Sequence, residues 1–173
     1  MKKSIITFIF LFAILNCLFA QKVYTSLTIN AGTTICLTQS KNYTPGVHAG
    51  AIFAYGVSKK KNDAVTVAVA YQTIKFKFAQ SGGLNMTDIK FGYRFFPSSK
   101  TAVYLHPNLG IGFFSGSYGG KQANVNAGVA LGFLPKVGSG NLNVFAAFNR
   151  FRFNPGLSLL HLGVGYQFNF KGK

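Results

Sequence analysis

The stretch that decides the fold is Asn124–Phe133, NVNAGVALGF. Its odd-numbered positions, from Val125 to Phe133, are apolar, whereas the even-numbered positions between them are small or polar. The same split recurs in Asp88–Phe95 and in Leu160–Phe170. Because successive side chains of a β-strand point to opposite faces, each stretch predicts a strand with one apolar face and one face of small or polar side chains.

After Gln21, no stretch repeats apolar residues at helical spacing for three turns. The alternation recurs instead, interrupted by clusters of Gly, Pro, Asn, Ser and Lys, which are typical of turns. Each segment is close to the roughly 9–11 residues that a tilted strand needs to cross a bilayer. The predicted strands are 22–31, 46–57, 64–78, 85–96, 101–114, 122–134, 141–153 and 158–170.

The predicted connections differ between the two ends of the sheet. Those at 58–63, 97–100 and 135–140 are compact turns. The opposite end carries a long segment, 32–45, and the connections 81–83, 115–121 and 154–156. Outer-membrane barrels have short periplasmic turns and longer external loops, so the compact turns predict the periplasmic side.

The direction of the oily face distinguishes a membrane barrel from a soluble one. A soluble lipocalin-like barrel packs apolar residues inside. Eight strands leave an interior that side chains just fill, so the aromatic face would overfill it. The sequence therefore predicts an all-β fold, an eight-stranded antiparallel up-and-down transmembrane β-barrel, whose closure satisfies the backbone hydrogen bonds in lipid.

Two predicted strands change their apolar parity midway. In 64–78 the apolar positions are odd up to Tyr71 and even from Ile74. In 141–153 they are even up to Phe148 and odd from Phe151. Either a β-bulge lies near Gln72 and another near Asn149, or these strands leave the hydrocarbon there.

The first twenty residues predict a signal peptide, followed by one barrel domain, 21–173. Lys2 and Lys3 precede an apolar core from Ile5 to Leu15, and Ala20 is suited to cleavage. An alternative, a lipoprotein signal at Cys17, fits poorly because no small residue precedes that cysteine. Cleavage after Ala20 leaves Cys36 alone and excludes an intramolecular disulfide.

The net positive charge of the chain limits the classes of partner that it is expected to bind. The chain has 18 Lys and Arg against 2 acidic residues, and loss of Lys2 and Lys3 lowers its formal net charge from +16 to +14. Export makes nucleic acid an unlikely partner, and no nucleic-acid-binding motif is present. Anionic lipid headgroups, lipopolysaccharide above all, are the expected partner.

The C-terminal strand resembles the assembly signal of outer-membrane barrels: a polar residue, a glycine two positions later, and a hydrophobic pair one residue apart. The residues that carry this resemblance are His161, Gly163, Tyr166, Phe168 and Phe170. The chain from 21 to 173 is similar to the small eight-stranded family that includes OmpX and the OmpA transmembrane domain, although Lys171–Lys173 follow the last aromatic residue. The resemblance implies insertion by the barrel-assembly machinery into the outer membrane of a Gram-negative bacterium. It implies no particular activity.

A first candidate site is a polar network in the barrel lumen. If the 97–100 turn sets the register, Arg94 faces Tyr104 and Lys90 faces Asn108. The network either fills a narrow barrel with paired charges or forms a proton relay or a lipid-processing site. Its members are Asp88, Lys90, Arg94, Tyr104, His106 and Asn108.

A second candidate site combines cations with aromatic neighbours at the external strand ends. Lys75 and Lys77 alternate with Phe76 and Phe78, and Arg150 and Arg152 alternate with Phe151 and Phe153. These four cations either hold lipid-A phosphates or form a solvated rim.

The remaining features carry weaker hypotheses. Lys59–Lys61 lies in a compact turn and is either solvated or in contact with anionic headgroups or an acidic partner. His48, His106 and His161 have no metal-ligand spacing, so we expect no metal site and no cofactor.

Together these observations predict a non-enzymatic integral outer-membrane barrel. It would act as a structural protein or as an accessory subunit of a larger outer-membrane or secretion assembly. The short loops leave little surface for adhesion, apart from 32–45. The alternative is a lipid-A-modifying enzyme that uses luminal His and Asp, in which Asp88 would have to orient the base. A diffusion pore is disfavoured because eight strands leave no open channel.

Overall fold

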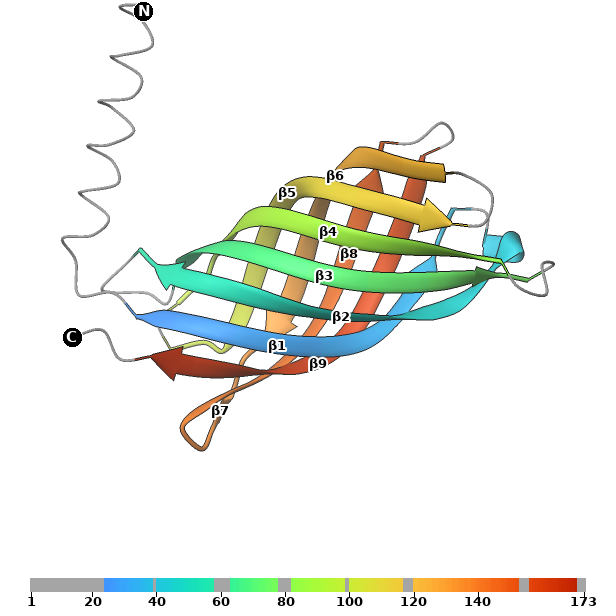
Figure 1. The fold of residues 1–173 in the computed structure, drawn as a ribbon. Helices are drawn as coiled ribbons and strands as arrows, with labels where there is room; N and C mark the ends of the chain where they lie inside the picture. The colour runs from blue at the N-terminus through green and yellow to red at the C-terminus, as the bar shows by residue number, and fades with distance from the viewer. Residues whose placement is uncertain are drawn as a thin grey trace, which may run out of the picture.

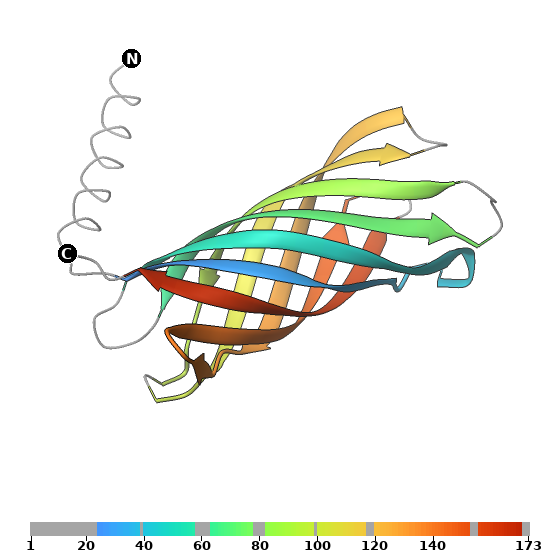
Figure 2. The ribbon, with the colours of Figure 1, turned by 60° about the horizontal axis from the view of Figure 1, so that its bottom comes forward.

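The chain forms a closed barrel of eight long antiparallel strands, with a ninth, two-residue strand in one turn (Figure 1, Figure 2). The computed structural model describes residues 24–38, 40–57, 63–77, 82–98, 100–116, 120–152 and 156–170. The predicted signal peptide, 1–20, lies outside them. The strands are β1 (Thr25–Cys36), β2 (Tyr43–Gly56), β3 (Ala64–Phe76), β4 (Gly83–Arg94), β5 (Val103–Gly116), β6 (Gly120–Phe133), β7 (Lys136–Val137), β8 (Gly140–Phe151) and β9 (Leu157–Phe170).

The connectivity is up-and-down. Each long strand pairs with the next one along the chain, β6 pairs with β8, and pairing of β1 with β9 closes the sheet. The predicted fold class is confirmed. The start of β1 and the end of β9 lie at one end of the barrel, which we call the terminal end; the opposite end is the loop end (Figure 1).

The outer face of the barrel is apolar. Ile29, Phe91 and Leu109 are 55%, 62% and 63% exposed. The inner face holds polar groups such as Asp88 and Asn143, both fully buried. Side chains this large and apolar are covered by lipid in a transmembrane barrel, so the oily face points outward as predicted. No helix among the described residues is long and apolar enough to span a membrane.

The predicted strand ends agree with the structure to within three residues at every end but one. Strand β1 continues to Cys36 instead of ending at residue 31, and the connection to β2 is only 37–42, with a 3-10 turn at Ser40–Asn42. The prediction of a long external segment at 32–45 was therefore wrong. Strand β1 is longer than predicted because it pairs with a neighbour on both sides. Thr34, for example, lies opposite His161 on β9 and Gly46 on β2.

Bulges near Gln72 and Asn149, one of the two explanations for the parity changes, are absent from these strands. The pairing of β3 with β4 runs without a shift through Gln72, and that of β6 with β8 runs without a shift through Asn149. The one register shift beside β3 lies in β2, between Thr44 and Val47. The strands keep their alternation, and the apolar residues after the switch, such as Phe151, turn inward and are buried.

The predicted register of β4 and β5 was also wrong, by two residues. Gly92, not Lys90, lies opposite Asn108. The connection is longer than the expected four-residue turn because Phe95 bridges Leu105, while the backbone N–H of Phe96 donates to the Asp63 carboxylate at 2.8 Å. A two-residue shift keeps every side chain on its predicted face.

Two features distinguish the β6–β8 region. The turn between these strands contains β7 and places Gly138 at a φ of 61°, which favours glycine. Strand β6 pairs with β5 along its whole length, from Gly120 to Phe133, but with β8 only over Asn126–Phe133. Within the described chain, β6 thus extends beyond β8 at the loop end.

Candidate functional site

The lumen is filled differently at three levels. Nearest the loop end, the inward side chains are apolar and pack into one cluster, which we call the apolar plug. Phe151, Ile74 and Leu159 in it are fully buried, and the rings of Phe114 and Phe151 meet edge to face at 5.1 Å. The plug seals this end of the lumen. Its members are Cys36, Ile74, Met86, Phe114, Phe151, Leu157 and Leu159.

The middle level is built around Asp88. Its carboxylate accepts hydrogen bonds from Gln72 Nε2 at 2.6 Å and Asn126 Nδ2 at 3.4 Å. Lys90 Nζ lies 3.3 Å from Asp88 Oδ2 and donates to Asn149 Oδ1 at 3.0 Å. The ion pair therefore has neutral partners on both sides, as a buried pair requires.

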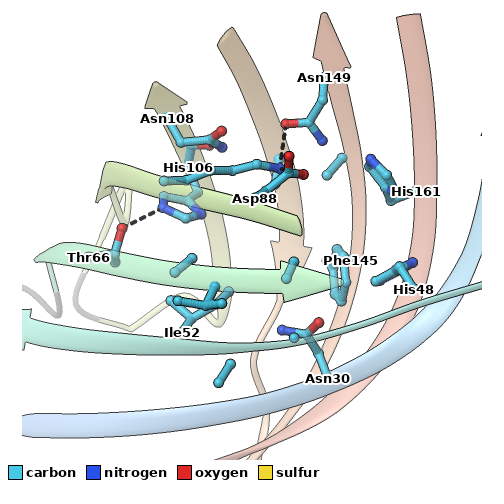
Figure 3. Close-up of a pocket in the computed structure, with 18 of the residues that line it drawn as sticks. Asn30, His48, Ile52, Thr66, Asp88, His106, Asn108, Phe145, Asn149 and His161 are labelled. Atoms are coloured by element: carbon cyan, nitrogen blue, oxygen red, sulfur yellow. Dashed lines mark hydrogen bonds and ion pairs between the residues drawn. The ribbon is translucent and has the colours of Figure 1, made fainter. Parts of the chain in front are cut away.

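Two of the three histidines lie together (Figure 3). The rings of His48 and His161 are 5.1 Å apart, edge to face, while His106 lies on the other side of the cavity. His161 Nδ1 is 3.0 Å from Thr34 Oγ1, and His106 Nε2 is 2.7 Å from Thr66 Oγ1. The described residues contain no group of three His, Cys, Asp or Glu side chains that could hold a metal ion.

These groups surround an internal cavity of about 80 Å³ (Figure 3). Several buried polar atoms around it have no partner among the described residues, including both ring nitrogens of His48, Nε2 of His161 and Oε1 of Gln72. A polar cavity of this size has room for several water molecules, each of which could bridge such atoms. The middle of the lumen can thus be a small hydrated chamber.

The geometry offers no complete acyl-transfer site among the described residues. Two hydroxyl–imidazole pairs exist, Thr34 with His161 and Thr66 with His106. Asp88 is bonded to Gln72, Asn126 and Lys90 rather than to an imidazole, so it orients neither base.

The third level, at the terminal end, combines an aromatic cluster with a buried cation. Tyr104 packs against Phe96 with ring centroids 5.9 Å apart, and Leu134 completes the cluster. Arg94 lies over the Tyr104 ring at 4.8 Å, and the Tyr104 hydroxyl donates to Asn143 Oδ1 at 2.8 Å.

All six residues of the predicted luminal network face the interior, but they form separate groups. Asp88 and Lys90 are paired in the middle level, Arg94 and Tyr104 are paired at the terminal end, and His106 is bonded to Thr66. The apolar plug was missed. Its signal was the parity change at Ile74 and Phe151, which can also arise from a bulge.

The predicted cation site lies on the outer face of the loop end. Lys75 and Lys77 are exposed on the β3 side, where Lys77 Nζ donates to the carbonyl of Ser40 at 3.3 Å. Arg150 is exposed on β8, and Arg152 is exposed just after its end; β8 lies four strands around the barrel from β3. Lys41 and Lys121 are further exposed cations at this end, and the chain's two acidic residues, Asp63 and Asp88, both lie elsewhere.

The residues of the predicted assembly signal occupy both faces of β9. His161 and Gly163 lie on the inner face, while Phe168 and Phe170 are exposed on the outer face. Tyr166 contacts the ring of Phe168 and donates its hydroxyl to the carbonyl of Val137 at 2.9 Å. The aromatic residues thus form an outward patch at the terminal end. The predicted Lys59–Lys61 site, like Phe78 and Phe153, lies outside the described residues.

Comparison with known proteins identifies the fold. The structure matches Neisserial surface protein A with a TM-score of 0.62 and 18% identity, over 87% of this chain and 98% of that one. It matches Ail, the attachment invasion locus protein of Yersinia pestis, with a TM-score of 0.60 and 17% identity, over 86% and 100%. Ail in complex with the heparin analogue sucrose octasulfate matches with a TM-score of 0.56 and 17% identity, over 86% and 100%.

The chain therefore has the fold of the small eight-stranded outer-membrane β-barrels, as its sequence resemblance predicted. No protein-family model matches the sequence, and no curated protein matches it. At these identities the likeness concerns the fold alone.

Proposed function

We propose that this chain is a non-enzymatic integral protein of the bacterial outer membrane, exported through a cleaved signal peptide and inserted by the barrel-assembly machinery. It would act as a structural barrel or as an accessory subunit of a larger outer-membrane or secretion assembly. The lipid-facing apolar belt and the fold of its structural neighbours support the location. In this orientation the terminal end faces the periplasm and the loop end faces the cell surface.

The apolar plug supports a role other than transport. Its inward side chains, such as Phe114 and Phe151, are buried against one another inside the loop end of the barrel. The hydroxyl–imidazole pairs lie behind the plug, away from lipids of the outer leaflet. A barrel sealed in this way offers its outer wall and its rim, rather than its lumen, to partners.

The observation that carries the proposal is the cation-rich rim at the loop end. Lys75, Lys77, Arg150 and Arg152 point outward on opposite sides of the barrel, and no acidic residue of the chain lies there to neutralise them. Lysine and arginine at this height form charge-assisted hydrogen bonds with phosphate. Lipopolysaccharide phosphates are the anions that would surround such a rim. The complex of Ail with a heparin analogue supports polyanion binding by a barrel of this fold.

Lipopolysaccharide retention tests the rim. In a variant with Lys75, Lys77, Arg150 and Arg152 all changed to Gln, we expect at least a twofold loss of co-purifying lipopolysaccharide per barrel. The matched control removes four cations predicted at the terminal end, by Gln at Lys59, Lys60, Lys61 and Lys100. The control should retain lipopolysaccharide like the unmodified chain. Equal retention in both variants would refute the rim site.

Purification from native membranes tests the accessory role. The tagged chain, extracted in mild detergent and sized by native gel and mass spectrometry, should migrate with a stoichiometric protein partner. Migration as a single barrel would favour the purely structural role and exclude the subunit role.

A further inference from the structure

A groove marks one side of the lipid-facing wall of the barrel. It crosses β6, β8 and β9, has a volume of about 690 Å³, and is lined only by apolar residues and glycines. Ala146 on β8 lies between Leu131 on β6 and Leu162 on β9, which are 59% and 44% exposed. The groove therefore forms where a short outward side chain is flanked by two long ones.

The shape and chemistry of the groove fit a hydrocarbon chain. A cavity of roughly 150 Å³ already holds a benzene ring, so a groove of about 690 Å³ has room for a chain of many methylene groups. Within a bilayer, the hydrophobic effect does not favour the wall over neighbouring lipid, because both are apolar. Dispersion attraction does favour the groove, because a chain lying in it has contacts beneath it and on both sides.

The outward face of β8 connects the groove to the cations at the loop end. Ala146, Phe148 and Arg150 alternate along the strand and are all exposed, so their side chains share the lipid-facing side. At roughly 3.3 Å per residue, the interval from Ala146 to Arg150 spans about 13 Å. One leaflet of a bilayer is about 15 Å of hydrocarbon, half of the core thickness. A lipid with its phosphate at Arg150 can therefore place an acyl chain in the groove.

The wall beneath the lysines of β3 has a different shape. Tyr71 precedes Lys75 by the same interval as Ala146 precedes Arg150, and it lies on the same outward face as Lys75. Its side chain is 51% exposed. An acyl chain would thus meet a projecting ring beneath Lys75 and a depression beneath Arg150.

We propose that the groove across β6, β8 and β9 binds one acyl chain of lipopolysaccharide, whose phosphate is held by Arg150 and Arg152. This inference rests on the proposed function and assigns different roles to the two groups of rim cations. Lys75 and Lys77 contribute attraction to phosphate alone. The β8 side recognises the phosphate and the acyl chain together.

The test uses the folded full barrel in neutral detergent and two ligands, intact lipopolysaccharide and lipopolysaccharide whose ester-linked acyl chains have been removed by mild alkali. Both ligands keep their phosphates. We define the acyl preference as the ratio of their dissociation constants, and we compare it between variants because intact lipopolysaccharide also enters detergent micelles. Ala146→Tyr fills the groove and should lower the acyl preference by about tenfold through lost packing contacts. Binding of the deacylated ligand should stay unchanged.

The matched control places the same ring on the opposite wall. Val67 is 39% exposed on the outward face of β3, and Val67→Tyr should leave the acyl preference unchanged. Ala146→Leu fills the groove with a smaller side chain and should lower the preference in the same direction, which keeps the test decisive if Ala146→Tyr does not fold. Heat-modifiable gel migration checks that each variant is folded.

Cation variants separate this inference from the proposed function. Arg150→Gln with Arg152→Gln should weaken binding of both ligands by about tenfold, whereas Lys75→Gln with Lys77→Gln should keep the acyl preference. Unchanged binding of both ligands in both cation variants would refute the rim site itself. If the cation variants weaken binding but Ala146→Tyr and Val67→Tyr have equal acyl preferences, the rim site stands and the groove proposal is overturned.

Discussion

The two ends of the lumen solve the same packing problem with different chemistry. At the loop end, the apolar plug fills the barrel with side chains such as Phe151 and Leu159 that need only complementary shape. At the terminal end, Arg94 and Tyr104 fill a similar cross-section but need a partner for every polar atom. The plug is complete by itself, whereas the terminal end leaves two donors of Arg94 unsatisfied. The loop-end interior is thus stabilised by apolar packing alone, whereas the terminal end carries the cost of buried polar atoms without partners.

The largest effect should follow damage to the plug. Phe151→Ala removes a fully buried ring and should lower the free energy of unfolding by about 3–5 kcal/mol. Urea titration followed by heat-modifiable gel migration measures the change. Phe148→Ala is the matched control, because Phe148 lies on the same strand but is 39% exposed on the lipid face. A loss as large in the control would show that the plug is no more important than the outer belt.

The second-largest loss of stability should follow a change in the middle level of the lumen. Asp88→Asn removes the counter-charge of Lys90 and should cost about 2–3 kcal/mol. Adding Lys90→Met removes the unpaired cation, so the double variant should recover part of the loss in the same urea assay. Additive losses in the two single variants would mean that the pair is not coupled.

A smaller effect is expected at the terminal end. Tyr104→Phe removes the hydroxyl that donates to Asn143 Oδ1 but keeps the ring beneath Arg94. The cost should be about 1 kcal/mol, the value of one neutral hydrogen bond. A loss comparable with that of Phe151→Ala would break the contrast between the two ends.

The smallest effect should come from the rim. Lys75→Gln with Lys77→Gln changes two exposed side chains and should shift the free energy of unfolding by less than about 0.5 kcal/mol. A larger loss in lipid-free detergent would show that these cations stabilise the fold itself.

The lipid-facing half of this structure could be predicted from sequence because one apolar face repeats every second residue. The alternation in Asn124–Phe133 fixed both the strand and its orientation. Inside the barrel, the same alternation could not say where the filling changes from polar to apolar, so Ile74 and Phe151 suggested bulges instead of a plug. Similarly, the role of Thr34 within β1 depends on partners more than a hundred residues away in sequence, such as His161.

The candidate sites were predicted less completely. Inward residues such as Asp88 and Arg94 could be placed by parity alone. Their partners could not. The bond between Asp88 and Gln72 depends on the register of the neighbouring strands β3 and β4, and the bond between Arg94 and Gln167 joins β4 to β9 across the lumen. The longer connection between β4 and β5 includes a hydrogen bond from the Phe96 backbone N–H to the Asp63 carboxylate, which no local pattern reveals.

The short pairing between β6 and β8 has a mechanical consequence. Interstrand hydrogen bonds carry the tension around the circumference of a closed sheet. Among the ladders between the long strands of the described chain, the one between β6 and β8 is the shortest, Asn126–Phe133 against Val144–Phe151. Under a pulling force or a lateral strain of the bilayer, we expect the cylinder to part along this seam first, with β1–β6 on one side and the β8–β9 hairpin on the other.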